Sequence, residues 1–393
     1  MESLNFLQLA EISSSIQASL KQESSSPNDH KELEPLSAAD VAGLLGMTTN
    51  ALYSLEKNGK VPKPKTRPNG AGMPIRYYTL EDLEALRNIL SKQPDQILIN
   101  GEKRAPIVAV NNLKGGVGKS AISIHVAQSL ARRGYKVLLV DLDAQASATS
   151  SFDYVPMRDL TAEDTILNAL VDDVYDVERV IRKTYWHNLD LIPSHLDLQN
   201  ADVIMLTDND SEKLGSPVER VKNALEIVRD LYDVIILDTP PSASVLSLGS
   251  VIAADYLVVP LVANMPDIEA TAVYFQTLNN LITNFYGDPN VAQPKRISLL
   301  VNRFDKKREA PTAANRSPSE QQTNLGLLRS AFGALVMDTV LKQTPEMQRA
   351  NNDMCSLYEN KPRGGRDAYK SALENMEELT DEILRNLFSL NGE

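Results

Sequence analysis

Two lysines, three glycines and a serine lie close together between residues 111 and 120, which read Asn-Asn-Leu-Lys-Gly-Gly-Val-Gly-Lys-Ser. Glycines let the backbone curl until successive N–H groups point at one anion, and a helix that starts there directs its positive dipole end at the same charge. An apolar run, Ile107 to Val110, precedes the segment, and a helical pattern follows it. This order predicts a loop that binds the phosphates of a nucleoside triphosphate, with Lys119 on the β and γ phosphates and Ser120 on Mg²⁺. The predicted nucleotide contacts are Lys114, Gly115, Gly116, Val117, Gly118, Lys119, Ser120 and Ala121.

Three aspartates follow apolar runs that have the composition of buried strands. Asp141 comes after Val137 to Val140, Asp143 follows two residues later, and Asp238 comes after Val234 to Leu237. Phosphoryl transfer needs a metal ion, neutralised charge and a positioned water more than it needs a covalent nucleophile. We therefore predict that Asp238 holds Mg²⁺ through water, together with Ser120. One aspartate after a strand is often only a helix cap, but its occurrence with both lysines favours the metal role.

The loop departs from the common phosphate-loop pattern because Leu113 stands where that pattern has its first glycine, and Lys114 is an additional lysine. The form K-G-G-x-G-K-[ST] resembles the deviant loop of the ParA/MinD superfamily of dimerising ATPases. That resemblance implies that Lys114 reaches the nucleotide of a partner subunit.

The run from Asp141 to Gln145 is similar to the D-x-D-P-Q segment of the same superfamily, with Ala144 in place of the proline. The resemblance implies that Asp141 supports the Mg²⁺ shell and that Asp143 orients the attacking water. The catalytic candidates are therefore Lys114, Lys119 and Asp143. The resemblance also implies that Asn302, at the end of the strand pattern Ile297 to Val301, contacts adenine. The alternative for Asn302 is an ordinary turn former.

Short apolar runs alternate with helical patterns from Pro106 onward. Continuous apolar strands that alternate with helices predict an α/β fold, a doubly wound and mostly parallel sheet of phosphate-loop type, over residues 104–393. The polar stretch from Asp305 to Asn324, which contains Pro311 and Pro318, is predicted to be a mobile surface loop.

The first residues form a separate pattern. Residues 1–22 carry Leu9, Ile12, Ile16 and Leu20 at helical spacing, which predicts a dimerisation helix. The alternative is a helix that packs on its own chain or frays. Residues 23–36 are polar and rich in serine and charge, which predicts a flexible linker.

Residues 37–96 are predicted to form a winged helix-turn-helix similar to the MerR type. Ser37 and Asp40 match a capping box, Gly46 ends the first helix, and a second helix begins near Thr48. Residues 57–76 then carry six cations and no acidic residue. The alternative is a small packing domain with a solvated charged loop. The predicted operator contacts are Thr49, Asn50, Tyr53, Lys57, Lys60, Lys63, Lys65 and Arg67.

The ParA-like part together with the N-terminal additions is similar to the larger partition ATPases of plasmids and phages. The resemblance implies an ATP-dependent homodimer that coats nonspecific DNA, a ParB-type centromere-binding partner that stimulates hydrolysis, and repression of its own operon by the ADP form. Lys342, Arg349, Arg363 and Arg366 are candidates for the nonspecific DNA surface, with ordinary solvated surface as the alternative. The alternative function is a nucleotide-sensing transcriptional repressor in which hydrolysis is incidental.

Composition limits the remaining possibilities. A net charge of −12 argues against a generally basic surface, so DNA must meet local patches. A single cysteine, Cys355, excludes a disulfide framework and a cysteine-ligated zinc site. No secretion signal or membrane span is expected, and the acid-rich stretch from Asp367 to Leu390 argues against a MinD-like membrane cycle. We expect a cytoplasmic, nucleoid-associated protein.

Overall fold

The computed structural model describes residues 31–68, 72–171, 176–207, 214–305, 319–359 and 365–391. The predicted helix 1–22 lies outside the described residues, as do Arg363 and most of the predicted linker 23–36. The chain forms two compact units that divide after Leu33, and the helices and strands named below belong to the unit Glu34–Glu393.

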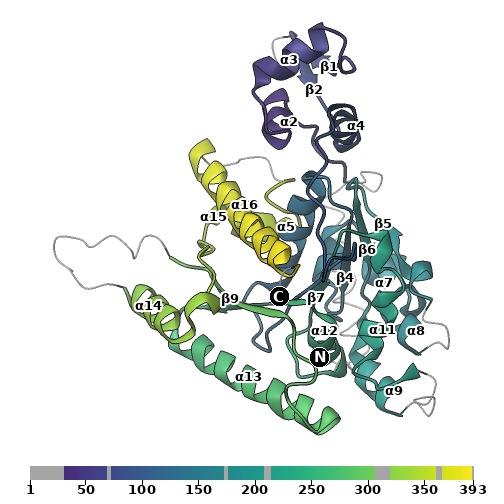
Figure 1. Cartoon of the computed structure of the whole chain (residues 1–393), viewed down its shortest axis with the longest axis vertical. Coiled ribbons are helices and arrows are strands. Elements are labelled where there is room, and N and C mark those ends of the chain that lie inside the picture. Colours follow the sequence, from purple (N-terminus) through teal and green to yellow (C-terminus); the bar gives the residue numbers. More distant parts are fainter. Residues whose placement is uncertain are drawn as a thin grey trace, which may run out of the picture. The chain divides into compact units, whose positions relative to one another are not determined.

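A seven-stranded sheet in the order β5-β6-β4-β7-β3-β8-β9 forms the centre of the larger part (Figure 1). All neighbouring strands pair in parallel except β5 with β6, which confirms the predicted mostly parallel sheet. The strands are β3 (Ile107–Val110), β4 (Val137–Asp141), β5 (Arg182–Lys183), β6 (Leu189–Ile192), β7 (Val234–Asp238), β8 (Tyr256–Val262) and β9 (Arg296–Asn302).

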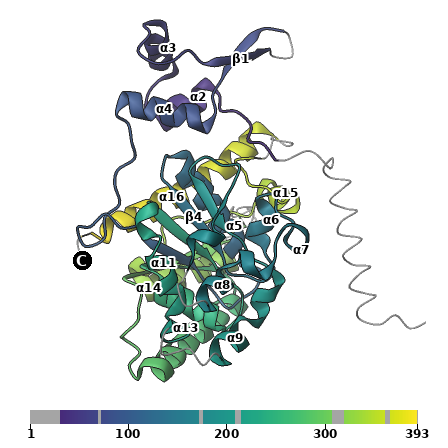
Figure 2. The ribbon, with the colours of Figure 1, turned by 90° about the vertical axis from the view of Figure 1, so that its right-hand side faces the viewer.

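Helices cover both faces of this sheet (Figures 1 and 2). α5 (Lys119–Arg132) connects β3 to β4, whereas α12 (Val245–Ala253) connects β7 to β8 in the opposite direction along the sheet. Because such crossovers are right-handed, the two helices lie on opposite faces. α16 (Arg366–Ser389) packs beside α5. α9 (Ala201–Thr207) and α11 (Arg220–Glu226) pack with α12, and α8 (Ile166–Val171) packs with α9 and α11. Further α-helices among the described residues of this part are α6 (Ser147–Ser151), α7 (Pro156–Asp159), α13 (Met265–Tyr286), α14 (Glu320–Phe332) and α15 (Pro345–Asn352).

Pro260 lies inside β8, although proline has no N–H for a sheet ladder. β3 pairs with β8 only as far as Val258, so no strand lies beside Pro260 on that side. Its carbonyl oxygen instead accepts a hydrogen bond from Nδ2 of Asn112 at 2.9 Å. The proline is therefore tolerated where β3 ends and the phosphate-loop segment begins.

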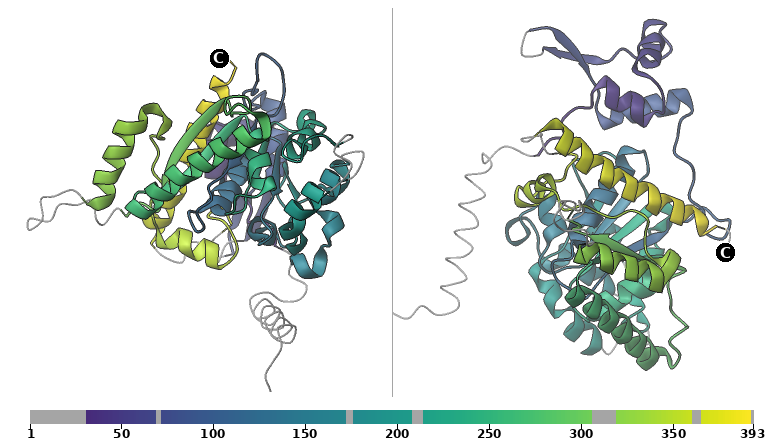
Figure 3. Two further views of the ribbon diagram at one scale, coloured as in Figure 1. Left: turned by 90° about the horizontal axis from the view of Figure 1, so that it is seen from below. Right: turned by 90° about the vertical axis from the view of Figure 1, so that its left-hand side faces the viewer.

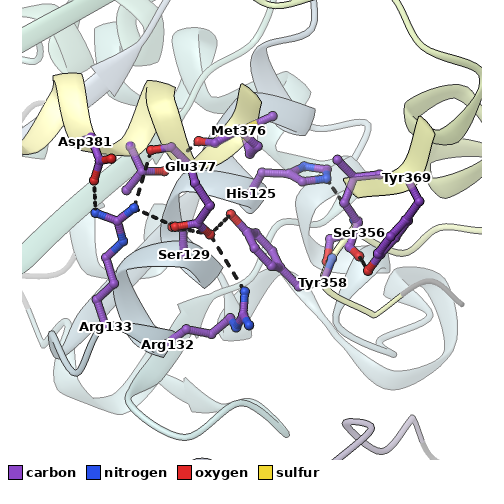
Figure 4. Close-up of polar contacts among 12 residues, drawn as sticks. His125, Ser129, Arg132, Arg133, Ser356, Tyr358, Tyr369, Met376, Glu377 and Asp381 are labelled. Atoms are coloured by element: carbon purple, nitrogen blue, oxygen red, sulfur yellow. Dashed lines mark hydrogen bonds and ion pairs between the residues drawn. The ribbon is translucent and has the colours of Figure 1, made fainter. Parts of the chain in front are cut away.

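A polar network joins α5 to α16 (Figure 4). Glu377 of α16 accepts hydrogen bonds from Nη2 of Arg133 at 2.5 Å, from Oγ of Ser129 at 3.1 Å and from the hydroxyl of Tyr358 at 2.7 Å. Burial alone would raise the pKa of Glu377, but Arg133 and these hydrogen bonds outweigh it and hold that pKa below its usual value. The carboxylate is thus ionised, and it fixes the C-terminal end of α5 against α16. α16 is the long yellow helix in the right-hand view of Figure 3.

The N-terminal part contains α2 (Ala38–Leu44), α3 (Thr49–Lys57), the hairpin β1 (Lys65–Pro68) with β2 (Pro74–Tyr77), and α4 (Leu80–Leu90). Ser37 and Asp40 form the predicted capping box, and Gly46 follows α2 with φ +59°. The two predicted helices are confirmed, and the basic stretch includes an antiparallel hairpin. Leu52 and Leu83 are fully buried between these helices, which gives the part its own small core.

The prediction of a loop from Asp305 to Asn324 is wrong at its C-terminal end. α14 begins at Glu320, where Ser319 and Gln322 form a capping box. Asn324 is buried, and its Nδ2 donates to the carbonyl oxygen of Ala263 at 3.1 Å. The polar composition that suggested a loop therefore belongs partly to a helix start. Within the described residues, no helix is long and apolar enough to span a bilayer.

Candidate nucleotide site

The loop between β3 and α5 is anchored by two buried asparagines that follow the strand. Asn111 Nδ2 donates to the hydroxyls of Ser247 and Ser250 at 3.1 and 3.0 Å, while Asn112 Oδ1 accepts from the backbone N–H of Lys114 at 2.9 Å. These bonds fix the start of the loop against α12 and leave its glycines to shape the turn. The sequence predicted this loop, but not its asparagine anchors.

Gly118 is the position where the loop requires glycine. Its φ is +96°, a conformation that residues with a side chain rarely adopt, and it caps the N-terminus of α5. A Cβ atom there would lie 2.4 Å from Nδ2 of Asn302. The close approach of β9 and the loop therefore depends on the missing side chain.

The two lysines of the loop differ in exposure. Lys119 is 6% exposed, and its Nζ donates to the carbonyl oxygen of Lys114 at 3.3 Å. Burial lowers the pKa of Lys119, although the nearby carboxylates of Asp238 and Asp143 oppose the shift. The side chain of Lys114, in contrast, is exposed at the loop rim. The structure thus places one lysine inside the site and the other outside it.

Asp141 ends β4 with both carboxylate oxygens occupied by the protein. Oδ2 accepts from the N–H and the hydroxyl of Thr149 at 2.8 and 2.7 Å, and Oδ1 accepts from the N–H of Asp143 at 3.2 Å. Burial raises the pKa of Asp141 to about 7, although the hydrogen bonds from Thr149 oppose the shift. This pattern suits an anchor for the loop that follows β4.

Asp238, at the end of β7, is fully buried, and its carboxylate accepts fewer hydrogen bonds than that of Asp141. Its Oδ1 accepts from the hydroxyl of Ser123 at 3.4 Å, while Oδ2 has no hydrogen-bond partner among the described residues. Burial and then the neighbouring Asp141 raise the pKa of Asp238, and the hydroxyl of Ser120 opposes this. A buried, unsatisfied carboxylate oxygen beside Ser120 fits hydrated Mg²⁺, which would restore its ionised form. Among the described residues, no cluster of His, Cys, Asp and Glu forms a separate metal site.

Asn302 ends β9 and closes the other side of the loop. Its Nδ2 donates to the carbonyl oxygen of Val117 at 2.7 Å. A cavity of about 170 Å³ lies next to it, lined by residues that include Gly118, Ala121, Asn302, Gln343 and Met347. The cavity adjoins the start of α5, so a nucleotide whose phosphates occupy the loop has space there for its base.

Residues that the sequence did not single out hold Asp143 in place. Thr149 of α6 and Ser194, which follows β6, are both fully buried and both bond to the Asp141–Asp143 segment. Their place in the fold explains this role. β6 lies beside β4, and the carboxyl ends of adjacent parallel strands line one edge of the sheet.

The predicted operator-binding residues fall into two groups. Most are exposed on α3 and on the stretch that leads into the hairpin, among them Asn50, Lys57, Lys60 and Lys63. Others already have partners in the chain: Lys65 lies 3.8 Å from Asp82 and Arg67 lies 3.7 Å from Glu34. Thr49 is half-buried at the start of α3.

Tyr53 is covered by a neighbouring cation. The guanidinium of Arg76 lies 3.9 Å from the centre of the Tyr53 ring, and Nε of Arg76 is 3.4 Å from Oε2 of the buried Glu56. The ring is therefore half-buried against β2.

The four cations proposed for nonspecific DNA are not brought into one stripe by the described contacts. Lys342 lines the cavity beside Asn302, and Arg349 donates to Glu346 at 2.9 Å. Arg366 is exposed at the start of α16, and Arg363 lies outside the described residues.

Known proteins match this chain over most of its length. Residues 105–288 match the family described as AAA domain. SopA of Escherichia coli K12 is 28% identical over 369 residues, which cover 92% of this chain and 90% of SopA. The chain is similar to the ParA-type plasmid partition ATPases.

Solved structures agree with this assignment. A protein of Borrelia burgdorferi B31 assigned to plasmid partition, solved with AMPPNP bound, is 25% identical with a TM-score of 0.53, over 72% of this chain and 99% of its own. A solved chain described as a partition protein extends the similarity of fold to 99% of this chain and 100% of its own length, with a TM-score of 0.65 and 17% identity.

Proposed function

We propose that this ParA-type protein is a Mg²⁺-dependent ATPase that segregates DNA. In this proposal an ATP-bound homodimer binds nonspecific DNA of the nucleoid in the cytoplasm. A ParB-type centromere-binding protein stimulates hydrolysis and so releases the dimer, and the ADP form represses its own operon through the N-terminal part. The observation that carries the proposal is the difference in burial between the two loop lysines: Lys119 is buried and Lys114 is exposed.

The position of each lysine supports a distinct task. Lys119 lies beneath the loop, where it interacts electrostatically with Asp238 and Asp143. The β and γ phosphates of ATP would lie in the same place. Lys114 has its side chain in solvent, so its ammonium is available to the phosphates of a second subunit. A chain that used ATP only as a monomeric ligand would have no need for a second, outward lysine.

The remaining site residues support hydrolysis. Mg²⁺, when bound, would neutralise charge on the phosphates, and Ser120 and Asp238 are the residues placed to hold it, with Asp141 behind them. Asp143 is half-exposed at the carboxyl edge of the sheet, and in our proposal its carboxylate aligns the attacking water. Asn302 and the cavity beside it would take the adenine. The AMPPNP bound to the Borrelia burgdorferi protein supports ATP as the ligand.

The N-terminal part supports the operator-binding role. An exposed α3 next to a basic hairpin matches the arrangement in which a recognition helix reads base edges and a wing contacts phosphates. Lys57, Lys60 and Lys63 are exposed between these elements, so their ammonium groups can approach a DNA backbone.

The test is ATP turnover with nonspecific DNA and a candidate ParB-type centromere-binding protein, added separately and together. Wild type is compared with Lys114→Ala and, as a control, with Lys222→Ala, which removes an exposed lysine of α11. We expect synergistic stimulation in wild type and Lys222→Ala and none in Lys114→Ala. Absence of stimulation in wild type, with intact binding to its own promoter, would replace the partition motor with a nucleotide-sensing repressor.

A further inference from the structure

Two buried hydroxyl groups connect the end of β4 to the end of β6. The hydroxyl of Thr149 lies 2.7 Å from Oδ2 of Asp141, and the backbone N–H of Ser194 donates to that same hydroxyl at 2.8 Å. The hydroxyl of Ser194 lies 2.6 Å from the carbonyl oxygen of Asp143. We call Thr149 and Ser194 the hydroxyl relay.

The direction of each bond in the relay is fixed by its ends. The N–H of Ser194 can only donate, so the oxygen of Thr149 accepts from it and its own proton goes to the carboxylate of Asp141. The carbonyl oxygen of Asp143 can only accept, so the hydroxyl of Ser194 donates to it. Thr149 and Ser194 are both 0% exposed, so water cannot replace either hydroxyl without rearrangement.

The relay acts on the backbone of the residue that we propose for water alignment. The carbonyl oxygen of Asp143 accepts from Ser194 and also from the N–H of Ala146 at 2.8 Å. Ala146 has φ +53°, a left-handed conformation that costs an alanine about 1 kcal/mol and needs fixed surroundings. The N–H of Asp143 is held by Asp141, the residue that Thr149 orients. Both peptide groups that flank the Asp143 side chain are therefore fixed through the relay.

We propose that Thr149 and Ser194 are positioning residues for ATP hydrolysis, which set the place of the Asp143 carboxylate without contacting the nucleotide. This inference rests on the proposed role of Asp143. A misplacement of a catalytic group by about 1 Å can lower a rate about 100-fold, so loss of either hydroxyl lowers kcat. Neither residue belongs to the loop that holds the phosphates, so ATP affinity stays nearly unchanged.

The test is single-turnover ATP hydrolysis with Mg²⁺, together with binding of a fluorescent ATP analogue, on the full chain. Thr149→Val keeps the shape of threonine and removes the hydroxyl, whereas Thr149→Ser keeps the hydroxyl. Thr165→Val is the matched control, because Thr165 is also 0% exposed and its hydroxyl donates to the carbonyl oxygen of Ala162 at 2.7 Å, outside the relay. Ser194→Ala removes the second hydroxyl and serves if Thr149→Val does not fold.

We expect Thr149→Val and Ser194→Ala to hydrolyse ATP about 10- to 100-fold more slowly than wild type, with the dissociation constant for the analogue within about twofold. Thr149→Ser should recover most of the rate, and Thr165→Val should hydrolyse ATP at the wild-type rate even if its Tm falls. Equal rates in wild type, Thr149→Val and Ser194→Ala would overturn the relay, and so would a loss shared with Thr165→Val.

A double-variant cycle with Asp143→Ala separates the two proposals. If the relay acts through Asp143, then Thr149→Val has no further effect on the rate once Asp143 is alanine. A further loss in that background would overturn the relay while leaving Asp143 catalytic. A wild-type rate in Asp143→Ala alone would instead overturn the proposed role of Asp143.

Discussion

Nζ of Lys119 donates a hydrogen bond to the carbonyl oxygen of Lys114, 3.3 Å away, so the two lysines of the loop are joined side chain to backbone. This bond holds the ammonium of Lys119 beneath the loop, while the side chain of Lys114 extends outward from the same turn. The ammonium group of Lys119 is therefore held inside the site, while that of Lys114 is exposed to solvent.

The two lysines should give different defects when replaced. Lys119→Ala should weaken ATP binding by the single chain about 10- to 100-fold, since a hydrogen bond between charged groups contributes about 1.5–3 kcal/mol. Lys114→Ala should bind ATP almost as wild type does but should not dimerise with it. Titration with a fluorescent ATP analogue and sedimentation in ATP measure the two effects. Equal losses of affinity in both variants would contradict the assignment of Lys114 to a partner's nucleotide.

The glycines of the loop should differ in their tolerance of a methyl group. Gly118→Ala suffers both a positive φ and a contact 2.4 Å from Asn302, whereas Gly116→Ala has φ +77° and open space. We expect Gly118→Ala to lower Tm and ATP affinity more than Gly116→Ala does. If the contact is the cause, combining Gly118→Ala with Asn302→Ala should reduce its cost in Tm to that of Gly116→Ala. An unchanged loss of Tm in the double variant would mean that the positive φ at residue 118, and not the contact with Asn302, destabilises Gly118→Ala.

The basic stretch before and within the hairpin should contribute to the salt dependence of operator binding. The slope of log K against log salt is negative, and each phosphate contact adds about 0.9 to its magnitude, so Lys63→Ala should make the slope less steep by about 1. Lys65 lies near Asp82, so its contribution should be smaller. Binding to the promoter fragment of its own gene is measured over a range of salt, with Lys103→Ala as the exposed control. An unchanged slope in Lys63→Ala would remove this stretch from the DNA contact.

The strands and the phosphate loop could be predicted because their signals are local. A buried strand of a parallel sheet is a short continuous apolar run, and the run before Asp238 was sufficient to place β7. The same patterns could not give β5, which has two residues, both charged and one of them exposed. They also missed the start of α14 at Glu320, because the residues that cap a helix are the polar residues typical of loops.

The polar contacts that surround the site could not be predicted in the same way. Thr149 and Ser194 are 45 residues apart in sequence, and Ser129 and Glu377 are 248 apart. Periodicity indicates which face of an element is buried, but not which buried hydroxyl meets which carboxylate. The deviant loop and its aspartates were therefore found from sequence, while the residues that orient them required the structure.

His125 of α5 should make stability depend on pH. Its Nε2 accepts from the N–H of Leu357 at 3.0 Å, its Nδ1 lies 2.7 Å from the carbonyl oxygen of Ala121, and burial lowers its pKa. The unfolded chain takes up the proton more readily, so folding stability is full above about pH 6.5 and falls as pH decreases below it. Thermal unfolding of wild type and His125→Gln between pH 7.5 and 5.5 measures this. His187→Gln is the control, and equal pH slopes in wild type and His125→Gln would contradict a neutral, buried His125.

Glu377 and Glu374 lie three residues apart on α16 but should differ in their contribution to stability. Glu377 accepts from Arg133, Ser129 and Tyr358, and its side chain is 29% exposed. Glu374 is 60% exposed and lies 3.4 Å from Lys370 one turn away. Glu377→Gln leaves Arg133 with a weaker partner, so it should lower the free energy of unfolding by about 1–3 kcal/mol.

Glu374→Gln is the matched control, and it should cost no more than about 0.5 kcal/mol because an exposed pair on one helix contributes little. Urea unfolding at low and high salt distinguishes the two variants, since salt screens the exposed pair more than the half-buried network. Because α5 starts at the phosphate loop and ends at Arg132, loosening its C-terminal end in Glu377→Gln should also weaken ATP binding. A stability loss with unchanged ATP affinity would mean that the loop is held by Asn111 and Asn112 alone.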